Sequence, residues 1–218
     1  MPTTPDSPLD TLRADAVLRP LVTDLPSPAP RIHLSEVYPS LLRAIVGQQV
    51  STKAAAAIYR RFLAGFDLDP DDPLAVPAPR VLAKADPDFL RGLGLSRGKA
   101  SYVIALAEYF EAHPNAEADL RAMSDEEVAA ELTSIRGVGK WTAEMMMIFA
   151  MGRPDLLPLD DLAIYQSMIE LYGLDPTAGK RQLKAEMTAI AEAWRPHRSL
   201  ACLYLYAYRH ATRGQGAP

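Results

Sequence analysis

Apolar residues recur at helical spacing along almost the whole of this sequence. Leu41, Leu42, Ile45 and Val46 would share one face of a helix, and comparable patterns continue to about residue 212. No stretch shows the alternation of apolar and polar residues that is typical of a half-buried strand. The sequence therefore predicts an all-α protein of about ten short helices.

Residues that are typical of helix N-termini mark where several of these helices begin. Ser51, Asp86 and Ser96 are predicted N-caps, and Ser124 with Glu127 forms a capping box. Beyond them we expect helices at about 125–134, 140–151, 161–172, 179–194 and 197–212.

The first 35 residues differ from the rest because they hold many of the 19 prolines. They predict a loosely structured arm with at most one helix, over residues 9–22. The chain does not start with a basic region followed by an apolar stretch, and no later segment of about 18 residues lacks charges. We therefore expect a cytoplasmic protein with no membrane partner.

Composition excludes several classes of site. The single cysteine, Cys202, cannot by itself form a disulfide framework, a four-cysteine zinc site or a four-cysteine iron–sulfur cluster. The segment at 92–100 lacks the glycine and the hydroxyl residue that a phosphate-binding loop needs. A net charge of −4 argues weakly against a nucleic-acid partner, unless the basic residues gather on one face.

The stretch LTSIRGVGKWTAEMMM, residues 132–147, carries more information. Gly137 and Gly139 bracket a tight turn between a helix that ends near Ile135 and one that starts at Lys140. The first amides of a helix have no partner within it and attract an anion, and glycine lets a phosphate approach closely. A plain helix–helix turn has the same pattern, so both interpretations stay open here.

A pair of aspartates follows in LLPLDDLAIYQSM, residues 156–168. Asp160 and Asp161 precede an amphipathic helix, so one of them is expected to be its N-cap. The helix dipole and the amide donors favour an ionised carboxylate at this place. Such a group can stabilise a developing cation, although capping alone would account for one aspartate.

Five segments follow one another in the order that a known family shows: LLRAIVGQQVSTKAAAAI (41–58), LGLSRGKASYV (93–103), the 132–147 stretch, LPLDDLAI (157–164) and WRPHRSLACLYLY (194–206). Over about residues 38–208 the chain thereby resembles the helix-hairpin-helix DNA glycosylases, and among them the alkylbase, or 3-methyladenine, branch. The resemblance implies two helical subdomains with a DNA-binding cleft between them. It also implies a compact form without the β-rich N-terminal domain of larger members.

The resemblance places the parts along the chain as follows. Residues 1–36 would form an arm that packs with the C-terminal subdomain, 37–152 a helical-barrel subdomain with the helix-hairpin-helix at 132–147, and 153–218 the C-terminal subdomain with the catalytic aspartate. That aspartate corresponds to Asp161, and Asp160 is its structural partner or the cap.

The resemblance implies a DNA glycosylase, which cleaves the bond between a damaged base and its deoxyribose through an oxocarbenium-like transition state. Family members that also cut the backbone have a lysine at the position of Trp141, whereas here Lys140 lies one residue earlier and is rotated by about 100°. We therefore expect a monofunctional enzyme that excises alkylated purines of the 3-methyladenine type from double-stranded DNA in base excision repair and leaves an abasic site.

The base pocket implied by the resemblance contains Trp141, Met145 and His197. Trp141 would contact a flipped, positively charged base through a cation–π interaction. Core packing is the alternative for Trp141, and Met145 fits the core equally well.

Gln49 corresponds to the side chain that the family inserts into the opened duplex, and Gln48 is expected to be structural. Lys140 and the amides of Gly137 and Gly139 would bind phosphate. The family further implies a monovalent cation, Na or K, held by the backbone carbonyls of three residues: Thr133, Ile135 and Val138. We expect no other cofactor, and a monomer.

Two alternatives remain. One is an oxidised-base or mismatch glycosylase of the same fold, against which the missing cluster cysteines and the missing lysine both count. The other is a non-catalytic helix-hairpin-helix protein that binds DNA or senses lesions without turnover.

Overall fold

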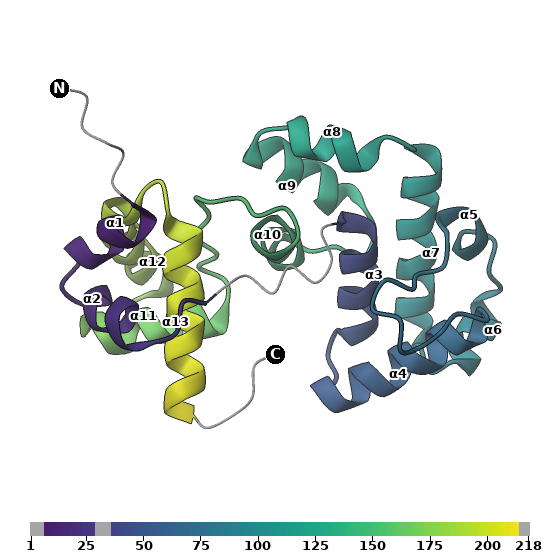
Figure 1. The fold of residues 1–218 in the computed structure, drawn as a ribbon, viewed down its shortest axis with the longest axis horizontal. Helices are drawn as coiled ribbons and strands as arrows, with labels where there is room; N and C mark the ends of the chain where they lie inside the picture. Colours follow the sequence, from purple (N-terminus) through teal and green to yellow (C-terminus); the bar gives the residue numbers. More distant parts are fainter. Residues whose placement is uncertain (1–6, 29–35, 214–218) are drawn as a thin grey trace. The chain divides into compact units, whose positions relative to one another are not determined.

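The computed structural model describes residues 7–28 and 36–213, and every regular element in them is a helix (Figure 1). The all-α prediction is thus confirmed for this part of the chain. Within the same residues, no helix is long and apolar enough to cross a membrane. The chain divides into two compact units: Met1–Arg31 with Gly152–Pro218 belongs to unit 1, and Ile32–Met151 to unit 2.

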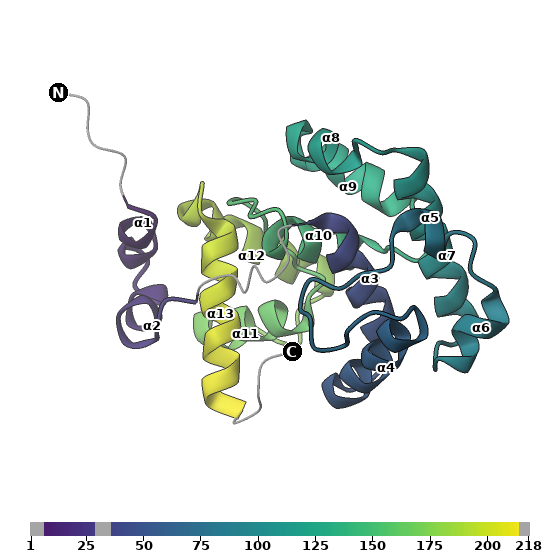
Figure 2. The same ribbon diagram turned by 45° about the vertical axis from the view of Figure 1, so that its right-hand side comes forward.

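Unit 2 is built from helices that follow one another along the chain. They are α3 (Val37–Gly47), α4 (Thr52–Gly65), α5 (Pro79–Leu82), α6 (Pro87–Gly92), α7 (Arg97–Ala112), α8 (Ala116–Ala122), α9 (Asp125–Ser134) and α10 (Lys140–Phe149). Helix α3 packs against α4, α7 and α10, as two views of unit 2 show (Figures 1 and 2). Its buried face, which includes Leu41, Leu42 and Ile45, therefore lies at the centre of the unit.

The predicted helix starts in unit 2 are confirmed. The hydroxyl groups of Ser51 and Ser96 accept the amides of residues at the third helical position, and Asp86 caps α6 through its carboxylate. Ser124 and Glu127 form the complete capping box. These caps satisfy amides that the helices themselves leave unpaired.

Unit 1 combines the two ends of the chain. Its helices are α1 (Pro8–Ala14), α2 (Leu18–Asp24), α11 (Leu162–Tyr172), α12 (Lys180–Ala191), the 3-10 turn η1 (Glu192–Trp194) and α13 (Arg198–Arg213). Helix α13 packs against both α11 and α2, and Figure 1 shows it in yellow beside the purple α2. Trp194 and Tyr204 are the largest side chains that are fully buried here.

The prediction of a loose N-terminal arm with one helix is wrong. Two helices replace it, and Leu12, Leu18 and Val22 are buried in the core of unit 1. The chain turns at Asp15, whose Oδ1 accepts the amides of Val17 and Leu18 at 2.8 and 3.1 Å. This break puts Pro20 in the first turn of α2, where its missing N–H costs nothing, whereas one continuous helix would lose a hydrogen bond there.

The other oxygen of Asp15 fastens these helices to the rest of unit 1. Oδ2 accepts the Tyr172 hydroxyl at 2.8 Å and the Trp194 indole N–H at 2.9 Å. Burial opposes ionisation of Asp15, but the bonds from Trp194, Tyr172 and the two amides of α2 outweigh it and hold its pKa below 3.8. One carboxylate thus starts a helix and joins segments far apart in sequence.

Candidate active site

The junction between α3 and α4 presents Gln49 to solvent in a strained backbone conformation. Gln49 has a φ of 56°, in the left-handed region that side chains other than glycine and asparagine rarely adopt. Its neighbour Gln48 donates from Nε2 to the carbonyl of Gly137 at 3.2 Å, which ties the junction to the hairpin. The structural role predicted for Gln48 therefore has a defined partner.

Lys99 fixes the same junction from α7. Its Nζ donates to the carbonyl of Val46 in the last turn of α3 at 2.8 Å, where the helix dipole favours a cation. Burial lowers the pKa of Lys99. Sequence reasoning missed this role, because Lys99 and Val46 lie 53 residues apart and no local pattern joins them.

The predicted hairpin is present between α9 and α10, and its two glycines serve different purposes. Gly137 has a φ of 94°, and a Cβ placed on it would lie 2.3 Å from Cγ of Tyr102. Gly139 has an ordinary φ of −88°, and no atom lies within 4 Å of a Cβ built there. The fold thus requires glycine at 137, whereas Gly139 leaves open space in front of the first amides of α10.

The hairpin offers carbonyl oxygens of the kind that a hard cation prefers. Thr133 lies in the last turn of α9, where carbonyls lack an intrahelical donor. The carbonyl of Ile135 accepts the amide of Val138 at 3.0 Å and keeps a second lone pair. Carbonyl oxygens are thus the right kind of donor, and the monovalent cation stays a prediction. Within the described residues, no cluster of three or more His, Cys, Asp or Glu side chains could hold a metal ion.

Trp141 and Met145 lie one turn apart on the same face of α10. Trp141 is 47% exposed, so the alternative that it packs in the core is wrong. Met145 is buried, which agrees with core packing, and its place in the base pocket stays a prediction. Lys140, which precedes Trp141, is exposed, and its Nζ lies 3.8 Å from a carboxylate oxygen of Glu144.

Asp161 is the N-cap of α11. Its Oδ1 accepts the amides of Ala163 at 2.9 Å and Ile164 at 3.0 Å, and the residue is only 6% exposed. The alternative that Asp160 is the cap is wrong, because the second aspartate directly precedes the helix. Asp160 instead forms ion pairs through Oδ1 with Lys184 at 2.5 Å and Lys180 at 3.5 Å.

His197 is half-buried in unit 1, immediately before α13. Its amide donates to the carbonyl of Trp194 at 2.7 Å. The predicted site residues are therefore divided: Asp161 and His197 belong to unit 1, whereas Gln49, Trp141, Met145 and the hairpin belong to unit 2. Within unit 2, hydrogen bonding joins the Gln48–Gln49 junction to the hairpin.

Comparisons with known proteins identify the family of this chain. A family model described as "HhH-GPD superfamily base excision DNA repair protein" matches residues 42–194. The chain belongs to this superfamily. In the described residues of this superfamily member, the regular elements are all helices, and the hairpin lies between two of them.

Individual relatives extend the comparison. DNA-3-methyladenine glycosylase 1 from Schizosaccharomyces pombe is 32% identical over 78% of this chain and 72% of its own length. A solved structure of DNA-3-methyladenine glycosidase from Bacillus halodurans has a TM-score of 0.77 and 30% identity, covering 98% of this chain and 94% of its own. A structure of the Schizosaccharomyces pombe enzyme Mag1 in complex with abasic DNA has a TM-score of 0.72 and 28% identity, and covers 91% and 94% of the two chains.

The chain spans only 58% of the length of another curated relative, YfjP from Bacillus subtilis, which is 31% identical over 78% of this chain.

Proposed function

We propose that this protein is a monofunctional DNA glycosylase that excises alkylated purines of the 3-methyladenine type from double-stranded DNA and leaves an abasic site. The observation that carries the proposal is the buried carboxylate of Asp161, fixed by two helix amides in a member of a base excision repair superfamily. The names of the relatives in Schizosaccharomyces pombe and Bacillus halodurans support the same activity.

The chemistry requires a fixed anion beside the sugar. As the bond from the base to C1′ breaks, the base leaves with the electron pair and positive charge develops on the deoxyribose. The amides of Ala163 and Ile164 orient Asp161 before the reaction, so that its charge stabilises this cation without reorganisation. Water adds at C1′ and loses a proton, and an alkylated purine that was cationic departs as a neutral base.

The residue at position 141 argues against cleavage of the DNA backbone. A Schiff base with the sugar needs an amine at the site, and Trp141 supplies none. Lys140 points about 100° away around the helix. Strand cleavage without alkali is therefore not expected.

Unit 2 offers surfaces for the DNA and the base. We assign three residues to the flipped base: exposed Trp141, Met145 one turn further along α10, and His197. The strained, exposed Gln49 is the wedge, the side chain that enters the opened duplex. Its amide would form a hydrogen bond with the base that has lost its partner.

The hairpin supplies the grip on the DNA backbone. The amides of Gly137 and Gly139, together with Lys140, bind phosphate, and a monovalent cation on the carbonyls of Thr133, Ile135 and Val138 would add positive charge there. We place the enzyme in the cytoplasm, because its single cysteine suits a reducing compartment, and we expect it to be a monomer.

The proposal is tested by base release. The purified protein is incubated with methylated DNA and with duplexes that contain hypoxanthine or ethenoadenine, and the released bases are identified by mass spectrometry before any alkali treatment. We expect release of methylated purines and accumulation of intact abasic strands. Strand breaks before alkali would contradict the monofunctional assignment, and binding without release would favour a lesion sensor.

Asp161→Asn is the matched control for this assay. Asparagine is as good an N-cap as aspartate, so α11 should keep its stability. Loss of the anion should lower the rate of release by about 100- to 1000-fold. A variant that kept the wild-type rate would remove Asp161 from the mechanism.

A further inference from the structure

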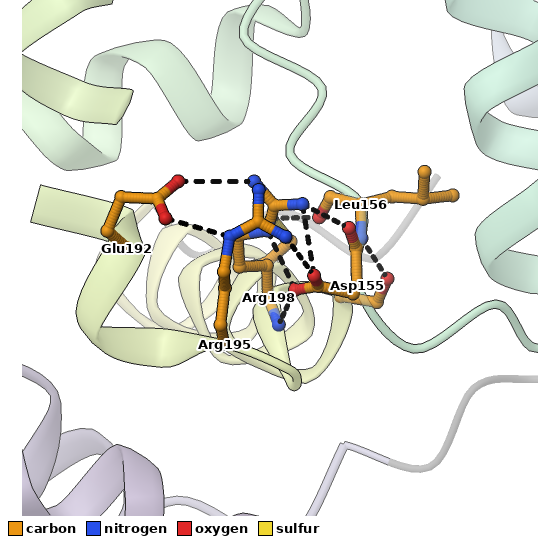
Figure 3. Close-up of polar contacts among 7 residues, drawn as sticks. Asp155, Leu156, Glu192, Arg195 and Arg198 are labelled. Atoms are coloured by element: carbon orange, nitrogen blue, oxygen red, sulfur yellow. Dashed lines mark hydrogen bonds and ion pairs between the residues drawn. The ribbon is translucent and has the colours of Figure 1, made fainter. Parts of the chain in front are cut away.

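The segment that leads to Asp161 has no helical structure of its own. Between the end of α10 and the start of α11, residues 151–161 form turns and irregular chain. Backbone groups in such a segment need partners from elsewhere. Residues 154–156 find them in the first turn of α13 (Figure 3).

The side chain of Arg198 binds both the carboxylate and the main-chain carbonyl of Asp155. Nε of Arg198 donates to Oδ1 at 2.7 Å, and Nη2 donates to Oδ2 at 3.1 Å and to the main-chain carbonyl of Asp155 at 2.7 Å. Arg195 donates to Oδ2 at 2.6 Å, and Figure 3 shows Glu192 on the opposite side of the two guanidinium groups. Only the planar fork of an arginine can make the three bonds of Arg198 at once.

Ser199 continues the attachment on either side of Asp155. Its amide, one of the unpaired donors at the start of α13, donates to the carbonyl of Pro154 at 2.9 Å. Its hydroxyl accepts the amide of Leu156 at 3.0 Å. Pro154, Asp155 and Leu156 are therefore all held by two consecutive residues.

The rest of the segment is short and is fixed again at its far end. The amide of Asp161 donates to the carbonyl of Pro158 at 2.9 Å, which closes a turn. Asp160 is bound by Lys184. Few residues separate 154–156 from Asp161, so a displacement of residues 154–156 should also displace the carboxylate of Asp161.

We infer that Arg198 and Ser199 are positioning residues for Asp161, acting through Asp155 and Leu156. The contacts that Arg198 and Ser199 make with residues 154–156 are here called the clasp. This inference rests on the proposed glycosylase function, because it assigns the clasp a role in the reaction. It makes the base-release rate, rather than affinity for DNA, the property that depends on Arg198. Misplacement of a reacting group by about 1 Å can cost about 100-fold in rate.

The test compares Arg198→Met with a matched variant, Arg209→Met. Both arginines lie on α13, with side chains 14% and 12% exposed, and both bind a carboxylate. Arg209 pairs with Glu170 and Gln166 of α11 rather than with residues 154–156. Single-turnover release of 3-methyladenine is measured for each variant, together with the Kd for a duplex that contains an abasic-site analogue.

We expect Arg198→Met to release the base about 10- to 100-fold more slowly, with little change in Kd for the abasic duplex. Arg198→Lys should recover part of the rate, because lysine keeps the charge but not the fork. Arg209→Met should keep the wild-type rate. A wild-type rate in Arg198→Met, or a loss of abasic binding in parallel with the rate, would overturn the inference.

Hydrogen exchange separates failure of this inference from failure of the proposed function. If the wild-type protein releases no base, the proposed function fails, and exchange at the amides of Leu156 and Asp161 still tests the clasp. Faster exchange there in Arg198→Met than in Arg209→Met supports it, and equal exchange contradicts it. Ser199→Ala, which removes only the acceptor for Leu156, provides a milder variant if Arg198→Met does not fold.

Discussion

The two units hold their candidate site residues in different ways. In unit 2, the hairpin and the junction between α3 and α4 depend on backbone geometry: a positive φ at Gly137, close contact with Tyr102, and side-chain donors that bind backbone carbonyls. In unit 1, the segment before Asp161 and the N-terminal helices depend on the carboxylates of Asp155 and Asp15. The comparison teaches that unit 2 should be sensitive to small changes of backbone shape, and unit 1 to loss of charge.

The largest effect should come from Gly137→Ala. A positive φ is unfavourable for alanine and its Cβ would overlap Tyr102, so we expect a loss of about 2 to 4 kcal/mol in the free energy of unfolding. Urea unfolding of the purified protein measures it. The variant should also bind DNA poorly, because the hairpin cannot close.

Gly139→Ala is the control for that variant. Its φ is ordinary and its Cβ meets no atom, so only the preference for glycine over alanine at an N-cap is lost, at most about 1 kcal/mol. We expect weakened DNA binding with nearly normal stability. Equal losses of stability in the two variants would contradict the different roles of the glycines.

The second effect should appear in unit 1 with Asp15→Asn. An amide NH₂ at the place of Oδ2 accepts neither the Tyr172 hydroxyl nor the Trp194 indole N–H. The variant should therefore lose about 2 kcal/mol near neutral pH, a modest figure because the group is partly exposed.

The loss should depend on pH in a defined direction. The pKa of Asp15 in the folded protein lies below its ordinary value of 3.8. Its contribution to the free energy of unfolding is therefore fully present above pH 3.8 and is lost as the pH falls through the lowered pKa. The difference in unfolding free energy between wild type and Asp15→Asn should therefore shrink in acid. Asp10→Asn, on α1 in an exposed pair with Arg13, is the control and should show little difference at any pH. If the difference in unfolding free energy between wild type and Asp15→Asn stays constant down to pH 3, the charge of Asp15 does not stabilise the fold.

The same comparison explains what could be predicted from the sequence. Caps at Ser51, Ser96 and Ser124 were predictable because a cap and the amides that it binds are at most a few residues apart. Asp15 was not, because the indole N–H that it accepts lies 179 residues away. Its carboxylate also created the break that turned one expected helix into two.

The candidate site divides along similar lines. The hairpin and the aspartate pair were recognisable as local patterns, and the structure decided that Asp161 rather than Asp160 caps α11. The clasp between Asp155 and Arg198 joins residues 43 apart, and nothing in either local sequence identifies the partner. The strain at Gln49 was equally hidden, because glutamine has no turn preference that would predict a positive φ.

The smallest effect, and the one that best separates fold from function in unit 2, is expected for Gln49→Gly. Glycine adopts a φ of 56° without strain but loses more entropy on folding, so the variant should be neutral or more stable by up to about 1 kcal/mol. If Gln49 is the wedge, binding to a duplex with an intact lesion should weaken more than binding to one with a pre-exposed abasic site. A strained residue whose removal spares stability and impairs only lesion binding is retained for function, since the fold does not need it. Equal losses on both duplexes would leave the strain without that explanation and would remove the wedge role from Gln49.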